Sequence, residues 1–374
     1  MRHVVLRQVH GVRESAAIRH AMRMLHAAPT AAKFLALLLL LLNAGSWPFV
    51  WHLRVLRCVV QMQLSFRLLR LRHIFAGKER RRLASRDWYE ARLPIGVHPF
   101  HKTWKYSWRV GFHDSDFLLH MSNSSYAQVL DRVRMQLALT TFPTFLRCGG
   151  FAPLAAMHYH FIREIPMLSR YEVRASVGSW DEKWLYIVFR FVLPNSARGA
   201  SLDAPSPSTP AAQQTGEALG NAEPDAVAEA LLACAAKEQE PDGAEVYAVV
   251  VNRFCYKLGR ITVPPAVVLA ANGFYAAPDT TRTAGSPPYP PHWPAVRALN
   301  ASIPAFRKFF TGGWRDVPAG ERWWEDAFAA CEAERRERLA PFVGEQDVGD
   351  DRSGGKVSNA GLVGGMERVR RLVF

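Results

Sequence analysis

The stretch of sequence that decides the fold is residues 103–137, TWKYSWRVGFHDSDFLLHMSNSSYAQVLDRVRMQL. Its first ten residues alternate between apolar and polar side chains, so the apolar ones share one face: Trp104, Tyr106, Trp108, Val110 and Phe112. This alternation predicts a half-buried β-strand over residues 103–112. Between Tyr126 and Leu137 apolar residues recur at steps of three and four, which predicts an α-helix. Ser122 or Asn123 is placed to cap its N-terminus.

The rest of the central sequence predicts four more strands and a short helix. Strand-like alternation recurs over four segments, at residues 156–163, 169–177, 183–193 and 245–256. The short link at residues 178–181 suits an antiparallel hairpin. Pro264 and Pro265 are placed to start a helix that runs toward Ala271. A strand, a helix and four strands together predict an α+β hotdog fold, in which a curled antiparallel sheet wraps one helix.

The positive charge of the chain is confined to its N-terminal part. Residues 1–86 hold sixteen Lys and Arg but only two acids, Glu14 and Glu79, so they carry the whole formal charge of +14. The remaining residues hold equal numbers of basic and acidic side chains. A nucleic-acid-binding domain carries basic residues on its folded surface. The distribution therefore indicates a membrane or a targeting role for the N-terminus, and no nucleic-acid partner is predicted.

An apolar segment near the N-terminus predicts a membrane anchor. Residues 34–51 contain no charged side chain, and a helix of that length would rise about 27 Å, close to the thickness of a bilayer core. Residues 1–33 then form a basic leading segment. Residues 52–97 form a basic juxtamembrane linker, of which 52–86 suits an anionic membrane surface.

The anchor leads to a prediction of location. Six basic residues precede the apolar segment and ten follow it, which favours a cytosolic domain on a single-pass protein of the endoplasmic reticulum membrane. The Arg-rich and acid-poor composition of residues 1–33 also suits a mitochondrial presequence. The mitochondrion is therefore the alternative location.

Two further regions lie outside the regular pattern. Residues 194–244 are rich in Ala, Pro, Ser, Gly and acids, which predicts a disordered surface insert within a domain that spans residues 98–275. Residues 276–374 form a C-terminal extension with a predicted helix near 324–339. No cofactor is predicted, because the sequence holds no Gly-rich phosphate loop. The five cysteines are scattered, and His158 and His160 share a strand face without a third ligand, so no metal site is predicted either.

The loop between the first strand and the helix carries a family resemblance. Asp116, His120, Asn123 and Tyr126 stand at the spacing found in hotdog-fold thioesterases. Asp114 and Asp116 together resemble the Asp-x-Asp element of the 4-hydroxybenzoyl-CoA thioesterases, whose second Asp is catalytic. The resemblance is greatest to membrane-anchored proteins of the thioesterase superfamily member six type. It extends to four further matches, Phe117, Met121, residues 180–182 (WDE) and residues 190–192 (RFV), and covers residues 98–275 without the insert.

The resemblance implies an acyl-CoA thioesterase with catalytic Asp116 and His120. Asp116 would act as base or nucleophile, and His120 would assist. The substrate would contact Asn123, Tyr126 and the backbone N–H groups of Ser124 and Ser125 at the helix start. Hotdog relatives pair their sheets edge to edge, so a homodimer is implied as well.

Plainer interpretations of the same residues stay open. Asp116 can form an Asx turn, His120 can be a core histidine, Asn123 can serve as the N-cap, and Tyr126 can belong to the core. Leu118 stands where the plant acyl-carrier-protein thioesterases have Asn. Ser122 likewise stands where Asn is common. The alternative function is therefore a non-catalytic membrane protein of the hotdog fold that binds acyl chains or lipids.

Overall fold

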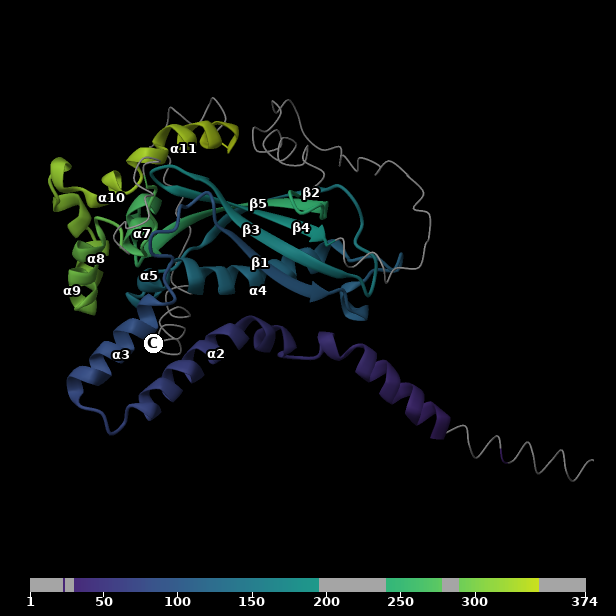
Figure 1. The fold of residues 1–374 in the computed structure, drawn as a ribbon. Helices are drawn as coiled ribbons and strands as arrows, with labels where there is room; N and C mark the ends of the chain where they lie inside the picture. Colours follow the sequence, from purple (N-terminus) through teal and green to yellow (C-terminus); the bar gives the residue numbers. More distant parts are fainter. Residues whose placement is uncertain (1–22, 24–29, 195–239, 278–288, 343–374) are drawn as a thin grey trace, which may run out of the picture.

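The sheet and its central helix have the predicted hotdog arrangement. The computed structural model describes residues 23, 30–194, 240–277 and 289–342. Five antiparallel strands form one sheet in the order β1-β3-β4-β5-β2, and their bounds are β1 Thr103–Arg109, β2 Leu154–Phe161, β3 Arg170–Trp180, β4 Trp184–Leu193 and β5 Glu245–Leu258. Between β1 and β2 comes the helix α4 (Asn123–Thr141), which lies across one face of the sheet (Figure 1). A short strand that the sequence did not predict, β6 (Ile261–Val263), pairs with β5.

The core lies between α4 and the inner face of the sheet. The apolar face of α4 is fully buried at Val129, Leu130 and Val133. It packs on inward-facing residues of the sheet, which include Val173, Ile187, Phe189, Phe191 and Val250. Burial of such side chains stabilises the fold by about 25 cal/mol for each Å² of apolar surface removed from water. The three-and-four periodicity of the sequence thus identified the buried face of α4 correctly.

The C-terminal extension is part of the same folded unit. Helices α7 (Pro265–Ala271), α8 (Trp293–Asn300), α9 (Ile303–Phe310) and α10 (Trp323–Asp326) pack at one end of the sheet, while α11 (Glu332–Leu339) lies over the face opposite α4 (Figure 1). The prediction of one helix over 324–339 was wrong. A 3-10 turn (Ala329–Cys331) separates α10 from α11, because the chain leaves helical geometry at Phe328 and buries that ring against Trp180.

The structure does not support the predicted membrane-spanning helix over residues 34–51. Residues 30–42 are helical, but a 3-10 turn follows at Ala44–Ser46, and α2 begins only at Val50 and runs to Arg72. Pro48 lacks the N–H that a continuous helix needs, and Phe49 has a φ of 67°. In the described part of the chain, no helix is both long enough and apolar enough to cross a membrane.

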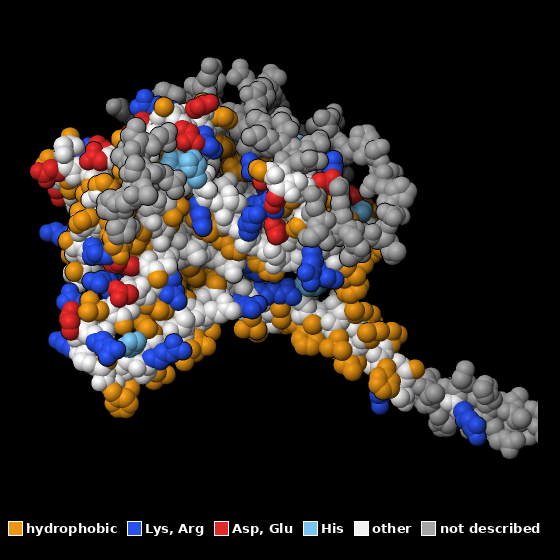
Figure 2. Space-filling view, viewed as in Figure 1, with side chains coloured by type: hydrophobic (Ala, Val, Ile, Leu, Met, Phe, Trp, Pro, Cys, Tyr) orange, Lys and Arg blue, Asp and Glu red, His pale blue; other side chains and the backbone are white. Residues whose placement is uncertain are grey.

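Helix α2 packs beneath α4 and turns back into α3 (Lys78–Glu90) (Figure 1). It contacts α4 through Val59, which is buried together with Leu139. Most other apolar side chains of α2 and of residues 30–42 are exposed, and Figure 2 shows apolar side chains along this arm of the molecule. The predicted insert falls largely on residues 195–239, and most of the leading segment 1–33 falls on residues 1–22 and 24–29; both lie outside the described residues.

Candidate active site

The loop that carries Asp116 is closed by its own backbone. Ser115 pairs with Met121, and the N–H of Asp116 donates to the carbonyl oxygen of His120 over 2.9 Å. Oδ1 of Asp116 accepts the N–H of Leu118 at 2.9 Å and that of His120 at 3.3 Å. Asp116 therefore forms the Asx turn that the sequence left open. These bonds use Oδ1 and leave Oδ2 for a water molecule or a substrate.

His120 meets a carboxylate that the sequence analysis missed. Its Nδ1 lies 2.8 Å from Oε2 of Glu164, close enough for an ion pair although off the line of a good hydrogen bond. Two backbone bonds hold the segments together, from the N–H of Met121 to the Ile165 carbonyl at 2.8 Å and from the N–H of Met167 to the Leu119 carbonyl at 2.9 Å. Glu164 lies 44 residues from His120 in the sequence, and only this pairing brings the two together.

Asp114 and His113 belong to a separate polar network. Asp114 is buried; its Oδ2 accepts the N–H of Gly111 at 3.0 Å, and its Oδ1 lies 3.3 Å from Nε2 of His113. Arg54 of α2 lies 2.8 Å from that same nitrogen. Because a guanidinium only donates, Nε2 accepts this bond. Burial lowers the pKa of His113, nearby Arg54 and Arg132 lower it further, and Asp114 opposes them.

The start of α4 places the serines differently from the prediction. Ser122 occupies the N-cap position, and its hydroxyl bonds those of Ser124 and Ser125 rather than a helix N–H. The hydroxyl of Ser125 donates to the Asp114 carbonyl at 2.9 Å, and its N–H donates to the Ser122 carbonyl at 2.9 Å. Asn123 is the first helical residue and is exposed. Of the two predicted oxyanion donors, the N–H of Ser124 is therefore the better candidate.

Tyr126 belongs to the core rather than to an open pocket. Its side chain is buried, with its ring 5.1 Å from that of Phe161 and 4.8 Å from that of Phe191. Burial raises the pKa of its hydroxyl well above the usual range. Tyr126 therefore belongs to the core, where it contacts β2 and β4, as the plainer interpretation stated.

An apolar cavity of about 220 Å³ lies farther along α4. It is lined by the second half of the helix, from Asp131 to Phe142, and by sheet residues such as Leu154, Ile187 and Phe254. Asp131 is eight residues from the start of α4, which corresponds to about 12 Å along the helix. The cavity is thus next to the core but away from Asp116.

The surface around Asp116 is unusually apolar. Phe117 is 91% exposed, and Leu118 and Leu119 are more than half exposed. Phe161 at the end of β2 and Leu168 in the paired segment are exposed as well. β2 is an edge strand that pairs only with β5 among the described strands. An exposed apolar patch beside an unpaired strand edge is typical of a surface that another chain covers.

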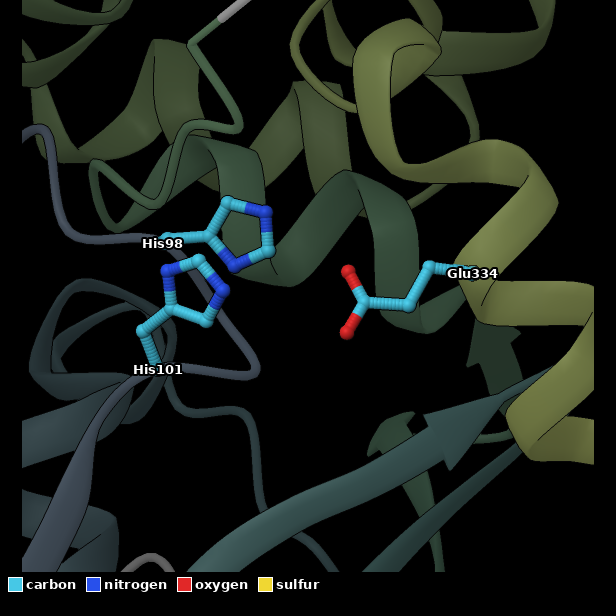
Figure 3. Close-up of side chains that lie close together, drawn as sticks. All are labelled: His98, His101 and Glu334. Atoms are coloured by element: carbon cyan, nitrogen blue, oxygen red, sulfur yellow. The ribbon is translucent and has the colours of Figure 1, made fainter. Parts of the chain in front are cut away.

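One group of side chains has the donors of a metal site. His98, His101 and Glu334 point toward one another, with donor atoms all within 4.8 Å (Figure 3). The two rings are stacked 3.9 Å apart, and Nδ1 of His98 accepts the N–H of Phe100 at 3.3 Å. Arg338 donates to Oε1 of Glu334 at 2.8 Å and so already supplies the positive charge that an ion would bring. The group links the segment before β1 to α11.

Comparisons with known proteins identify the central part of the chain. Residues 110–271 match the model of the thioesterase-like superfamily. A probable thioesterase of Emericella nidulans, atnL, is 27% identical over 263 residues, which are 63% of this chain and 69% of that protein. Protein THEM6 of Xenopus laevis is 31% identical over 112 residues, which are 28% of this chain and 51% of that protein.

Alignments to solved structures cover part of the chain. The 1,4-dihydroxy-2-naphthoyl-CoA thioesterase Slr0204 from Synechocystis aligns with 46% of this chain and 96% of its own, with 10% identity and a TM-score of 0.29. Among the curated relatives, the aligned part covers 69% of the Emericella protein but only about half (51%) of the Xenopus protein.

Proposed function

We propose that this chain, whose residues 110–271 match the thioesterase-like superfamily, hydrolyses acyl-CoA thioesters. The observation that carries the proposal is the paired loop that holds Asp116 beside His120 and Glu164 at the start of α4. Such a loop offers a carboxylate with one unengaged oxygen, an imidazole and a helix N-terminus. These are the groups that a thioester hydrolase needs.

Asp116 is the proposed base or nucleophile. Two backbone N–H groups hold its Oδ1, so its orientation is fixed before the substrate arrives. Oδ2 can then accept a proton from water or attack the carbonyl carbon. His120, held beside Glu164, would orient the water or receive its proton. The N–H of Ser124 would stabilise the negative charge on the thioester oxygen.

We propose that the active unit is a homodimer. The exposed apolar residues Phe117, Leu118 and Phe161 lie beside Asp116 and the edge strand β2. Pairing β2 with its copy would cover this patch and continue the sheet. A second chain would then form one wall of the acyl site.

Acyl binding without hydrolysis is the second candidate function. The observation that favours it is the apolar cavity of about 220 Å³ along α4, since such a cavity suits a hydrocarbon chain. An acyl group bound there would have its carboxyl end away from Asp116. The two functions therefore differ in whether the bound thioester is cleaved.

We also propose that the N-terminal helices lie on a membrane surface. Their exposed apolar residues are interspersed with Arg, which suits insertion of one face between anionic headgroups. These residues include Phe34, Leu38, Trp47, Phe49, Trp51, Leu64, Leu68, Ile74 and Phe75. The endoplasmic reticulum as the membrane, with a cytosolic domain, stays a prediction, and the mitochondrion stays its alternative.

One experiment separates hydrolysis from binding. The full-length chain is incubated with acyl-CoA substrates of increasing chain length, and release of free thiol is followed alongside binding of the same ligands. Release that saturates with substrate and depends on chain length would support the thioesterase. Saturable binding with no release from any substrate would instead favour the acyl-binding function.

A further inference from the structure

A cleft between α2 and β1 gathers positive charge next to the candidate active site. Its volume is about 550 Å³, and its lining holds five cationic side chains: Arg54, Arg57, Lys105, Arg109 and Arg132. Asp114 is the one carboxylate in that lining. Figure 2 shows Lys and Arg side chains gathered where the sheet passes over α2. The two walls come from segments that are far apart in sequence, and the cleft exists only because α2 packs on α4.

Most of this charge has no counterion among the residues that the structure describes. Lys105 has Asp242 at 3.5 Å. None of the ion pairs among the described residues, which join atoms within 4.0 Å, involves Arg54, Arg57, Arg109 or Arg132. The carboxylate of Asp114 already accepts the N–H of Gly111.

Arg132 makes the imbalance most apparent. Burial lowers the pKa of its guanidinium and the nearby charge of Arg54 lowers it further, while Tyr171 and Asp114 act in the opposite direction. Its guanidinium carbon lies 5.4 Å from the centre of the Trp108 ring, on which the ring of Tyr106 is stacked. Gathering like charges in a half-enclosed space costs free energy, and a bound anion would offset that cost.

The chemistry of the cleft selects one class of anion. Guanidinium groups bind phosphate through paired N–H donors, and several together suit a ligand that carries more than one negative charge. The aromatic wall formed by Tyr106 and Trp108 adds a surface for an organic part of the ligand. We propose that this cleft binds a phosphate ester and that α2, which lies outside the matched residues 110–271, adds this site to the family domain.

The position of the cleft relates it to the proposed reaction. His113 and Asp114 line the cleft, and Asp116 follows His113 by three residues, so their Cα atoms are at most about 11 Å apart. A coenzyme A thioester carries its phosphates on a long arm away from the acyl carbonyl, so one molecule would reach both places. This step rests on the proposed function.

The phosphate has two possible sources with the same chemistry. One is the phosphates of coenzyme A. The other is the headgroup of an anionic phospholipid, because α2 also exposes apolar residues such as Val60 and Leu64. Either ligand would bind the arginines of the cleft through its phosphate. This need for phosphate distinguishes such binding from a purely apolar contact.

Binding measurements on the full-length chain test the site. The probes are coenzyme A, pantetheine (which lacks phosphate), and phosphatidylcholine vesicles with and without phosphatidic acid. The test variant combines Arg57→Gln and Arg109→Gln, two exposed residues of the cleft. The control is Arg260→Gln with Arg307→Gln, which removes the same charge at two exposed residues outside both the cleft and the N-terminal helices. We expect the test variant to bind coenzyme A at least about tenfold more weakly than the wild type and the control.

Each outcome decides one question. Loss of coenzyme A binding in the test variant, with pantetheine unaffected, supports the site and identifies the coenzyme as the source. Loss that is confined to vesicles with phosphatidic acid supports it with a lipid headgroup as the source. If the test and control variants bind coenzyme A equally well, and also bind vesicles with phosphatidic acid equally well, the proposed phosphate site is overturned. Binding is measured without turnover. The result therefore stands even if Asp116 is shown to play no part in hydrolysis.

Discussion

His120 Nδ1 lies 2.8 Å from Oε2 of Glu164, and the two residues come from segments that are joined by backbone hydrogen bonds. The pairing fixes which way the imidazole faces. It also places a negative charge where a positive charge on His120 would develop if the imidazole took a proton from water. In the proposed mechanism, this dyad gives His120 a role that its place in the sequence alone did not define.

Replacement of Glu164 by Gln should lower kcat by about tenfold and leave KM nearly unchanged, because Gln keeps the shape but removes the charge that favours protonated His120. Steady-state hydrolysis of a soluble acyl-CoA measures both constants. Glu182→Gln, an exposed change in the β3–β4 turn, is the matched control. A Glu164→Gln enzyme as fast as the control would remove Glu164 from the mechanism.

A single acidic residue in the apolar patch should break the proposed dimer. Phe117→Glu places a charge on a side chain that is 91% exposed in one copy but would be covered in two. Light scattering should give twice the 42.0 kDa chain mass for the wild type and the chain mass for the variant. Phe75→Glu, at a fully exposed site between α2 and α3, should stay dimeric. A monomeric wild type would contradict the dimer.

Acid should destabilise the C-terminal extension through His292. Burial lowers its pKa from 6.5 to about 4, while its Nε2 donates to the Ala270 carbonyl at 3.2 Å. Below pH 6.5, His292 binds a proton in the unfolded chain but stays neutral in the folded chain. The free energy of unfolding therefore falls as the pH drops toward 4. The full loss is about 3 kcal/mol.

Urea unfolding at about pH 7 and about pH 5 measures this loss. His292→Gln keeps a neutral donor for the Ala270 carbonyl and cannot be protonated. Its unfolding free energy should therefore change less between the two pH values than that of the wild type. An equal change in both proteins would show that other groups cause the acid sensitivity.

The parts of the fold that the sequence predicted are those with a local cause. Alternation at Trp104 and Trp108 and the three-and-four spacing from Tyr126 reflect which face each element buries, so β1 and α4 appeared where expected. The helix over 324–339 was wrong because burial of Phe328 against Trp180, a distant residue, decided where it broke. The span over 34–51 is not supported, because its prediction rested on composition and gave too little weight to Pro48, a local helix breaker.

The residues of the candidate site also fall into those that the sequence predicted and those that only the tertiary structure brings together. Asp116 and His120 were found because their spacing along the chain carries the family resemblance. Glu164 and Arg54 were missed because only tertiary pairing brings them to the loop, by the β2–β3 connection and by the packing of α2 on α4. A basic and apolar N-terminus indicated a membrane, but it gave no sign that Arg54 would reach His113.

The contact of the C-terminal segment with the sheet should matter for stability. The Phe342 ring is buried and stacks 4.9 Å from that of Tyr186. A Cβ at Gly178 would come within 3.1 Å of the same ring, so glycine allows this close approach. Phe342→Ala should lower the free energy of unfolding by about 3 kcal/mol, and the exposed Phe75→Ala should change it little. Chemical denaturation compares the two, and equal midpoints would contradict the packing role.

The central claim is that the carboxylate of Asp116 drives thioester cleavage. The most direct measurement is the rate of free-thiol release from acyl-CoA by the Asp116→Asn variant, with Asp87→Asn, an exposed aspartate of α3, as the control. Asn keeps the Oδ1 that binds the N–H of Leu118, so the loop should stay folded. The account predicts a loss of at least about a hundredfold in kcat for Asp116→Asn and wild-type rates for Asp87→Asn. Wild-type release by Asp116→Asn would contradict it.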